Sequence, residues 1–311
     1  MTTKSGKELF KVGIGTYGIG GRGHRNMDLT EKENDQLYLD AIAYTIQKGF
    51  NFTEVSLGYG HGEAMRLLGI ALGQDVSMRE DLFITHSLYL NDLPDFQTIE
   101  RDTESFYKIL HTAYADSTLV TQSILQTFGE TNIYKFLHGL LESGRTRFVS
   151  LSNASPAWIK KFKAEFGDAF FAHEGHLSFE IRALQDKGVF AVCDELGVKN
   201  IIWRPLGRNA TLTRDWELLT RLEEKYKKTR SQIILNWMTH SGYMPMVFST
   251  NTIHIDENYE SDSFTMTSSE YDELTAFRPP NYKEPDVDWE GLKGGNDIVS
   301  LISNFDQNQQ N

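Results

Sequence analysis

The sequence has a single cysteine, no long hydrophobic run and no excess of positive charge. With Cys193 alone, no intramolecular disulfide can form, and nothing points to an oxidising compartment. The opening residues hold no apolar core of the kind a signal peptide needs, and no stretch is long and apolar enough for a membrane helix. A formal net charge of −12 argues against a general nucleic-acid or membrane-surface binder. These absences predict a cytoplasmic protein.

What is present is an ordinary globular composition. The chain has 311 residues, of which 40% are hydrophobic and 24% charged, and a chain of this size buries a large core. We expect one domain over residues 1–311, because α/β barrels reach this length as a single unit. From about residue 279 we expect an irregular, proline-rich tail, with a short apolar turn at residues 298–302 and a disordered end. Cys193 lies in an apolar helical pattern and is predicted to be a buried structural thiol.

Short apolar runs alternate with longer helix-patterned segments along the chain. Several runs are apolar on successive residues, which is typical of parallel strands covered on both faces. Eight such strands alternating with helices predict a closed (β/α)₈ barrel. The expected strands are residues 11–17, 51–56, 82–88, 117–123, 146–153, 169–176, 200–206 and 244–250.

Helix signals support this reading. Residues 38–48 place apolar side chains at helical spacing and stop before Gly49, a typical residue just past a helix end. Ser155 and Pro156 predict an N-cap followed by a first-turn proline. Residues 218–239 form a long amphipathic stretch.

An open doubly wound sheet is the structural alternative. The segment from Gly13 to Gly18 matches the Gly-x-Gly-x-x-Gly string that opens many dinucleotide-binding sheets. Here a polar loop follows the string, whereas those sheets continue with an apolar helix. The barrel is therefore favoured.

Six motifs in order along residues 11–275 give the chain a resemblance to the aldo-keto reductases. Each lies at the C-terminal end of a predicted strand, the face where barrel enzymes place their sites. The motifs are Gly13-Ile-Gly-Thr-Tyr-Gly, Asn51-Phe-Thr-Glu-Val-Ser-Leu-Gly-Tyr-Gly-His-Gly-Glu, Asp81-Leu-Phe-Ile-Thr-His-Ser, Ser150-Leu-Ser-Asn, Trp203-Arg-Pro-Leu-Gly-Arg and Ser249-Thr-Asn-Thr-Ile-His-Ile-Asp-Glu-Asn.

The resemblance implies a nicotinamide dinucleotide cofactor, NADP(H) in preference to NAD(H). Ser152 and Asn153 match the pair that holds the nicotinamide carboxamide in this family. These two residues can also be interpreted as a helix cap, but Ser155 already fills that role, so the cofactor role is favoured. Trp203 matches the aromatic residue that stacks on the ring. Further implied cofactor positions are Thr16, Leu206 and Glu174, the last standing where the family has a glutamine.

The adenosine end of the cofactor is implied to bind after the eighth strand. Backbone amides at such a loop-to-helix turn can hold a phosphate. A lysine of the family is replaced here by Phe248, and Arg204 is a candidate for supplying the missing charge. The implied adenosine-side residues are Ser249, Thr250, Asn251, His254 in place of an arginine, Glu257 and Asn258.

The family reduces carbonyls with a tyrosine, a lysine, an aspartate and a histidine, the tyrosine giving the proton while the cofactor supplies the hydride. By resemblance, Tyr59 is the tyrosine and Glu54 takes the place of the aspartate. Ser87 replaces the lysine and Thr121 replaces the histidine. Three of the four positions are thus substituted, and Tyr59 loses the cation that activates it.

His86 precedes Ser87 and offers a replacement cation. Alternation along a strand points Ser87 toward the barrel mouth and His86 away from it. A one-residue bulge would bring His86 inward. We predict no metal site, since neither His61-Gly-Glu63 nor His173-Glu-Gly-His176 has a recognised zinc spacing with a third ligand.

Three functions remain open from the sequence. The first is an NAD(P)H-dependent reductase of a small aldehyde or ketone with altered catalytic residues. The second is an inactive barrel that binds the dinucleotide as a sensor or regulatory subunit. The third is a barrel with other chemistry, using Glu54, Tyr59 and His86 as acid–base groups. The retained cofactor positions favour the first two, and the retained tyrosine favours the first. Residues 18–32 and 209–214 are expected to set substrate specificity.

Overall fold

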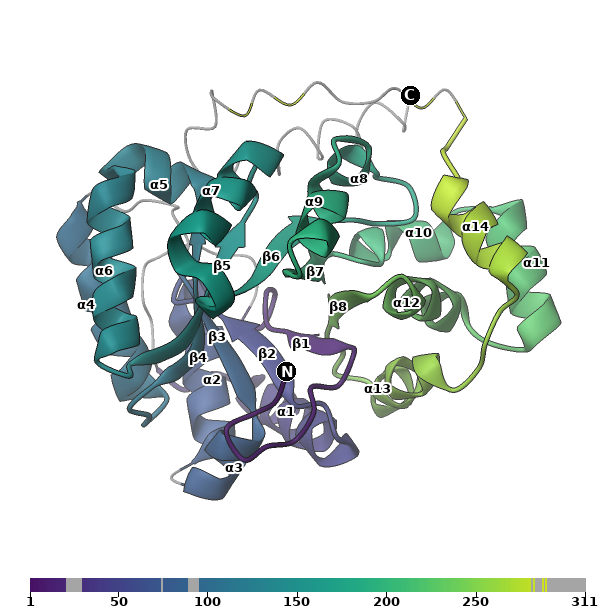
Figure 1. Cartoon of the computed structure of the whole chain (residues 1–311). Helices are drawn as coiled ribbons and strands as arrows, with labels where there is room; N and C mark the ends of the chain where they lie inside the picture. Colours follow the sequence, from purple (N-terminus) through teal and green to yellow (C-terminus); the bar gives the residue numbers. More distant parts are fainter. Residues whose placement is uncertain are drawn as a thin grey trace.

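Eight parallel strands pair in sequence order and close into a barrel, and helices surround it (Figure 1). The computed structural model describes residues 1–20, 30–73, 75–88, 95–280, 282, 287 and 289. The predicted barrel is confirmed, because β1 pairs with β8 and no open sheet remains. The strands are β1 Gly13–Gly15, β2 Phe52–Val55, β3 Phe83–Ser87, β4 Ala115–Thr121, β5 Thr146–Ser152, β6 Phe170–His176, β7 Lys199–Trp203 and β8 Tyr243–Val247.

The helices that cover the strands lie between them in the chain. In the order of the chain, the 3-10 helices being marked η, they are α1 Asp35–Lys48, η1 Tyr59–Gly62, α2 Glu63–Leu72, α3 Val76–Asp81, α4 Phe96–Ile109, α5 Gln122–Phe128, α6 Glu130–Glu142, α7 Pro156–Phe166, η2 Gly167–Ala169, α8 Ala183–Asp186, α9 Val189–Glu195, η3 Gly207–Asn209, α10 Ala210–Thr213, α11 Glu217–Tyr226, α12 Arg230–His240, α13 Thr252–Tyr259, η4 Glu260–Asp262 and α14 Ser268–Ala276.

Two of the helix predictions are confirmed and one needs correction. Helix α1 ends at Gly49, whose φ of 114° suits glycine, and Ser155 caps α7 by accepting a hydrogen bond from the Trp158 amide at 3.3 Å. The stretch 218–239 is not one helix but two, α11 and α12. The chain turns at Lys227, which has a φ of 53°, and Thr229 begins α12 with a capping box.

Aromatic and methionine side chains fill the barrel interior toward the N-terminal ends of the strands. Phe83 lies 5.7 Å from Phe52 and 4.8 Å from Phe171 between ring centroids. Met246 packs so closely on β1 that a Cβ at Gly13 would lie 2.3 Å from its sulfur. Packing of this kind closes the lower part of the barrel, so a ligand site can form only at the upper end.

A buried ion-pair network joins α3, β3, β4 and β5. The Asp116 carboxylate is fully buried and accepts hydrogen bonds from Arg79 at 2.8 Å, from Arg147 at 2.6 Å and from the Ile84 amide at 3.0 Å. Asp116 lies near the start of β4, whereas Thr121 ends the same strand. The network therefore lies at the end of the barrel away from the C-terminal ends of the strands.

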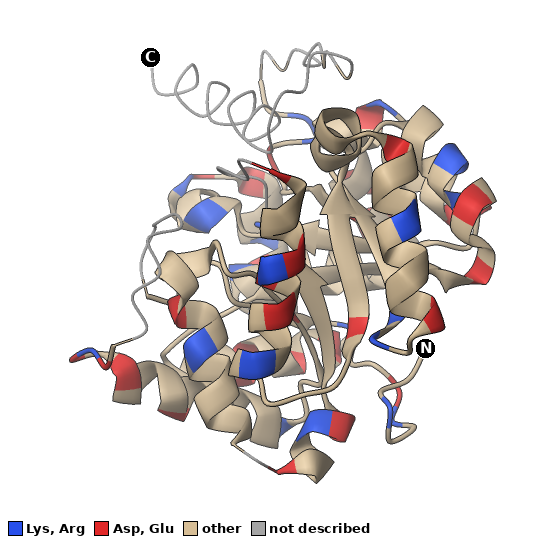
Figure 2. Cartoon of the chain, turned by 90° about the vertical axis from the view of Figure 1, so that its left-hand side faces the viewer, with Lys and Arg blue, Asp and Glu red and all other residues tan. Residues whose placement is uncertain are grey.

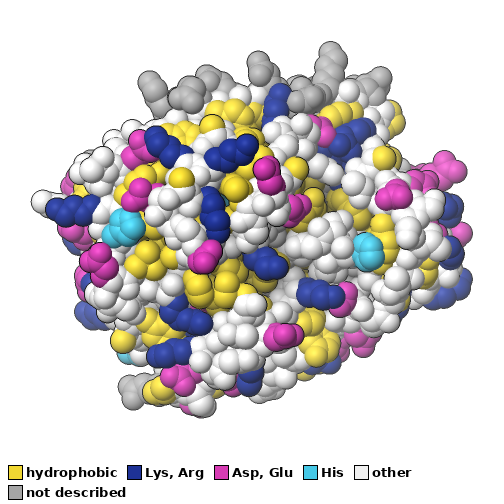
Figure 3. All heavy atoms as spheres, viewed as in Figure 1, with side chains coloured by type: hydrophobic (Ala, Val, Ile, Leu, Met, Phe, Trp, Pro, Cys, Tyr) yellow, Lys and Arg dark blue, Asp and Glu magenta, His cyan; other side chains and the backbone are white. Residues whose placement is uncertain are grey.

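Charged side chains lie on the outer helices and loops, while the strands between them are mostly uncharged (Figure 2). Figure 3 shows both signs of charge interspersed over one face. Within the described residues, no helix is long and apolar enough to span a membrane. Cys193 is buried in α9, as predicted, and burial raises the pKa of its thiol to about 12. The predicted apolar turn at 298–302 and the disordered end fall outside the described residues.

Candidate active site

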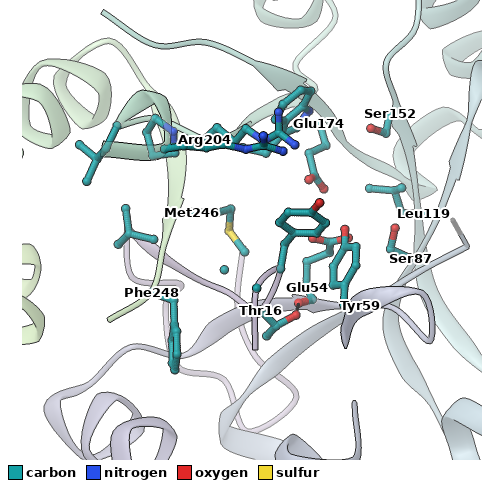
Figure 4. Close-up of a pocket in the computed structure, with 18 of the residues that line it drawn as sticks. Thr16, Glu54, Tyr59, Ser87, Leu119, Ser152, Glu174, Arg204, Met246 and Phe248 are labelled. Atoms are coloured by element: carbon teal, nitrogen blue, oxygen red, sulfur yellow. Dashed lines mark hydrogen bonds between the residues drawn. The ribbon is translucent and has the colours of Figure 1, made fainter. Parts of the chain in front are cut away.

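A cavity of about 420 Å³ opens at the C-terminal ends of the strands (Figure 4). The predicted site residues that line it come from seven different strands, β1 to β7, or the segments that follow them, which is how barrel enzymes assemble a site. They are Thr16, Glu54, Tyr59, Ser87, Thr121, Ser152, Asn153, Glu174, Trp203, Arg204 and Leu206.

Tyr59 and Glu54 form a buried hydrogen-bonded pair in this cavity. The Tyr59 hydroxyl donates to Oε1 of Glu54 at 2.7 Å, and the two side chains are 7% and 5% exposed. The turn that follows holds the tyrosine in place. Gly60 has a φ of 57°, and a Cβ there would lie 2.1 Å from the Ile19 carbonyl oxygen, so this close approach requires glycine.

Ser87 and Thr121 occupy the positions expected of them at the ends of β3 and β4. Ser87 is buried and hydrogen-bonds Glu54 through its side chain. Thr121 accepts a hydrogen bond from the Ile124 amide at 3.2 Å and thereby caps α5. The Thr121 hydroxyl thus has a structural partner besides any ligand.

His86 does not reach the cavity. Strand β3 pairs with β2 and β4 in regular register, without the bulge that would turn His86 inward. The imidazole is fully buried and stacks on Phe106 of α4 at 4.4 Å. Burial lowers the pKa of His86 to about 3, so the ring is neutral. The structure contradicts a role for His86 as a replacement cation, because strand alternation turns it into the helix layer.

Ser152 and Asn153 lie where β5 ends, beside Glu174 of β6. The Asn153 amide donates to the Glu174 carbonyl oxygen at 3.0 Å, and Asn153 has a φ of 51°. Within the described part of the chain, two side-chain oxygens here are buried without a hydrogen-bond partner, Oδ1 of Asn153 and Oε2 of Glu174. Buried acceptors in this state are ready to receive donors from a ligand.

The carboxyl groups of Glu54 and Glu174 point into the same space (Figure 4). Burial raises the pKa of Glu174 well above its ordinary value, and the neighbouring Glu54 raises it further. Burial also raises the pKa of Glu54, against hydrogen bonds from Tyr59 and Ser87 that lower it. The two hydroxyl donors oppose the rise in the pKa of Glu54, whereas burial and the neighbouring carboxyl group both raise the pKa of Glu174.

Trp203 and Arg204 form the opposite wall. Trp203 packs on His176 with 4.5 Å between ring centroids, and the Arg204 guanidinium carbon lies 5.0 Å from the centre of the Trp203 ring. Arg204 has a φ of 54°, so the chain leaves β7 in a sharp turn there. These contacts fix a flat aromatic surface beside a positive charge.

Residues 11–279 match the sequence profile of the Aldo/keto reductase family. The chain belongs to the aldo/keto reductase family.

Individual relatives agree with this assignment. The chain is 24% identical over 258 residues to a glyoxal reductase of Bacillus subtilis, which covers 82% of this chain and 89% of that protein. It is also 24% identical over 251 residues to the methylglyoxal reductase DkgB of Escherichia coli O157:H7, covering 79% and 90%. An aldo-keto reductase of Klebsiella pneumoniae, solved in complex with NADPH, has the same fold with a TM-score of 0.74, 16% identity, and coverage of 92% and 97%.

The segment that resembles the family's adenosine-binding residues lies beside the cavity, at the β8–α13 connection. Asn251 caps α13 by accepting from the Ile253 amide at 2.9 Å, and Ser249 accepts from the Asn251 amide at 3.0 Å. Asn258 is buried, with 6% of its surface exposed. The connection leads directly from Phe248, which lines the cavity. Of the predicted residues here, Thr250, Asn251 and His254 are exposed, and Ser249 and Glu257 are half-buried.

Several residues of the cavity were not predicted from the sequence. They lie in the C-terminal half of a strand or in the segment that follows it, which is the signal that marks such positions. Residues 209–214 were expected to set substrate specificity; Asn209 lines the cavity, and α10 follows it. Of the loop at 18–32, which lies largely outside the described residues, Gly18 lines the cavity. The lining residues that sequence reasoning missed are Gly15, Tyr17, Leu119, Pro205, Arg208, Met246 and Val247.

Proposed function

We propose that the protein is an NAD(P)H-dependent reductase of small aldehydes or ketones in which catalysis is weakened by substitutions around Tyr59. The observation that carries the proposal is that Tyr59, Ser152, Asn153 and Trp203 all line one cavity. The names of the relatives point the same way, since two are reductases of small dicarbonyl compounds. We propose NADP(H) over NAD(H) as the cofactor.

The residues present fit a nicotinamide. Oδ1 of Asn153 is a buried acceptor without a partner in the described residues, and a carboxamide NH₂ is the donor it lacks. Trp203 offers a flat surface for the ring, and Arg204 and Arg208 offer charge for phosphates. A bound reduced nicotinamide would supply the hydride for carbonyl reduction.

The proton would come from Tyr59. Its hydroxyl faces the cavity and is 2.7 Å from Glu54, which accepts its hydrogen. A carboxylate beside a phenol opposes loss of the phenol's proton, whereas the lysine of the family favours it. With Ser87 in the lysine's place, we expect reduction that is slower by orders of magnitude but not abolished, because positioning and hydride supply remain.

The second candidate is an inactive barrel that binds the dinucleotide as a sensor or regulatory subunit. The observation in its favour is that the described cavity wall carries no lysine, and that Tyr59 and Ser87 both direct their hydroxyl groups to Glu54. A site of this kind retains the binding surface and loses the groups that activate the proton donor.

Titration with NADPH and NADH, followed by tryptophan fluorescence, tests the shared binding step. We expect quenching by NADPH at micromolar concentrations, weaker binding of NADH, and loss of the response in Trp203→Ala, since that ring faces the cavity. Trp158→Ala is the matched control, because Trp158 lies on α7, away from the cavity lining. Failure of either nucleotide to bind at millimolar concentration would rule out both candidates.

Steady-state oxidation of NADPH with methylglyoxal then separates the two candidates. A slow turnover that falls at least a hundredfold in Tyr59→Phe supports the reductase, because general acid catalysis contributes about that much. Binding of NADPH without turnover of methylglyoxal or other small aldehydes and ketones supports the sensor.

A further inference from the structure

The charges of the cavity are arranged in two layers. At the floor lie the carboxyl groups of Glu54 and Glu174, each 5% exposed. The basic side chains among the described lining residues are Arg204 and Arg208, and both follow β7 at the rim. Figure 4 shows Arg204 on the far side of the cavity from Glu54. The floor is therefore acidic and the rim basic.

Among the described residues, no side chain donates a hydrogen bond to Oε2 of Glu174. The hydroxyl groups of Tyr59 and Ser87 both form hydrogen bonds with the carboxyl group of Glu54. Oε2 of Glu174 is buried and has no partner among the described residues. A buried carboxyl oxygen in this state is costly unless a ligand satisfies it, and a positively charged N–H group does so best.

We infer that this cavity takes a substrate whose reacting group is a cation, a protonated imine (iminium), held between Glu54 and Glu174. The inference rests on the proposed function, since it names the substrate class of the same reductase site. It replaces the neutral aldehyde or ketone as the preferred substrate.

Reduction of an iminium suits the residues that are present. The carbon of the C=N⁺ bond receives the hydride, the π electron pair of that bond moves to nitrogen, and a neutral amine results. The reduced nicotinamide supplies the hydride and is oxidised. The nitrogen arrives with its proton, so no acid has to protonate it during the reaction. The replacement of the lysine by Ser87 then slows the reduction little, because no proton donor has to be activated. The two carboxyl groups stabilise the cation before the reaction.

A bound cation would neutralise negative charge on Glu54 and Glu174 and so change the pKa values of both carboxyl groups. Burial and the neighbouring Glu54 raise the pKa of Glu174. A cation placed between the two groups favours the ionised form of both carboxyl groups and therefore lowers the pKa of Glu174. A neutral carbonyl compound has no such effect on the pair.

Equilibrium binding of pyrrolidine, which is protonated at pH 7.5, tests the inference without turnover. Its affinity is compared by calorimetry with those of tetrahydrofuran, an uncharged ring of the same size, and 2-pyrrolidinone, an uncharged N–H donor. Each compound is added to the full-length protein with and without NADPH. We expect pyrrolidinium to bind at least tenfold more tightly than either uncharged ring. Equal affinity for the three would overturn the inference.

Variants locate the preference in the acidic floor. Glu174→Gln keeps the shape and removes the charge, and we expect the tenfold preference for pyrrolidinium to fall below threefold. Ser87→Lys places a cation beside Glu54, and it should abolish the preference by a second route. Glu224→Gln is the control for net charge, since Glu224 is exposed on α11, and it should retain the full preference. Because the comparison of the three rings uses the unaltered protein, it decides the question even where a variant fails to fold.

Turnover distinguishes this inference from the proposed function. With NADPH, we expect kcat/KM for 1-pyrroline to exceed that for cyclopentanone at least tenfold. If NADPH binds and methylglyoxal or cyclopentanone is reduced as well as 1-pyrroline, the inference fails and the reductase stands. If NADPH does not bind, the reductase fails, and pyrrolidinium binding to the free protein still shows whether the floor holds a cation.

Discussion

Glu174 illustrates how one carboxyl group makes stability depend on pH. Its side chain is buried in the cavity floor, near the carboxyl group of Glu54. Ionisation of Glu174 therefore places a second negative charge where water is scarce and the first charge is close. The pKa of Glu174 in the folded protein therefore lies well above its ordinary value of 4.5.

Glu174→Gln is predicted to stabilise the protein more as the pH rises. With a raised folded-state pKa, the stability contributed by Glu174 is fully present below 4.5 and is lost as the pH rises through the raised value. Glutamine cannot ionise and escapes this loss. Urea unfolding at pH 5 and pH 8 measures the difference in unfolding free energy. We expect the advantage of the variant to grow between these pH values. An advantage that is the same at both, or that Glu224→Gln reproduces, would contradict the argument.

Individual site residues were predictable where a single strand decides their direction. Period-two alternation on β3 predicted that Ser87 faces the mouth and His86 the helices, and the structure has them so. The pairing of Glu54 with Glu174 was not predictable in the same way. The two residues lie on β2 and β6, across the barrel from each other, so their proximity depends on barrel closure and on the packing beneath them.

At the scale of elements, the buried network around Asp116 fastens a helix to three strands. Arg79 comes from α3 and Arg147 from β5, while the Ile84 amide belongs to β3. A carboxylate with this many donors is well satisfied, but removing it leaves a buried guanidinium without its counter-ion.

Asp116→Ala is predicted to lower the unfolding free energy by about 3–5 kcal/mol, the usual cost of breaking a buried ion pair from one side. Chemical denaturation followed by circular dichroism measures it. Glu273→Ala is the matched control, because its pair with Arg221 is half-exposed on both sides, and an exposed pair contributes at most about 1 kcal/mol. Similar losses in the two variants would show that the network does not join these elements.

The existence of the strands was predictable, and their ends were less so. Buried parallel strands give continuous apolar runs, and each of the eight expected segments overlaps a strand. Strand β7 was expected to reach Leu206, but it ends at Trp203 because Arg204 takes a left-handed conformation with a φ of 54°. The break between α11 and α12 occurs at Lys227 without glycine or proline. The signal for it was Thr229-Arg-Ser-Gln232, which fits a capping box.

At the scale of the whole molecule, closure makes every strand depend on its neighbours. Strand β1 joins β8 through Gly13 with Met246 and Ile14 with Val247, so the barrel has no free edge. If the chain is one domain, as its length predicts, disruption of the pairing between β1 and β8 unfolds all eight strands together.

Thermal unfolding is therefore predicted to give one transition, with the same midpoint by circular dichroism and by tryptophan fluorescence. NADPH at about a hundred times its dissociation constant should shift both signals together, since binding to the folded state alone adds about 2.7 kcal/mol. Trp203→Ala should lose the shift. Two separate transitions, or a shift in one signal alone, would show that the barrel unfolds in parts.

Strand β4 carries Asp116 near one end and Thr121 at the other, five residues further along. At about 3.3 Å per residue, some 17 Å separate Asp116, which joins α3 to the strands, from Thr121, which lines the cavity. Side chains at the upper end can be exchanged with little disturbance to the lower end. Evolution can thus change the chemistry at the mouth of the barrel while the lower end, which stabilises the fold, stays the same. A library of variants confined to the mouth should therefore remain largely folded.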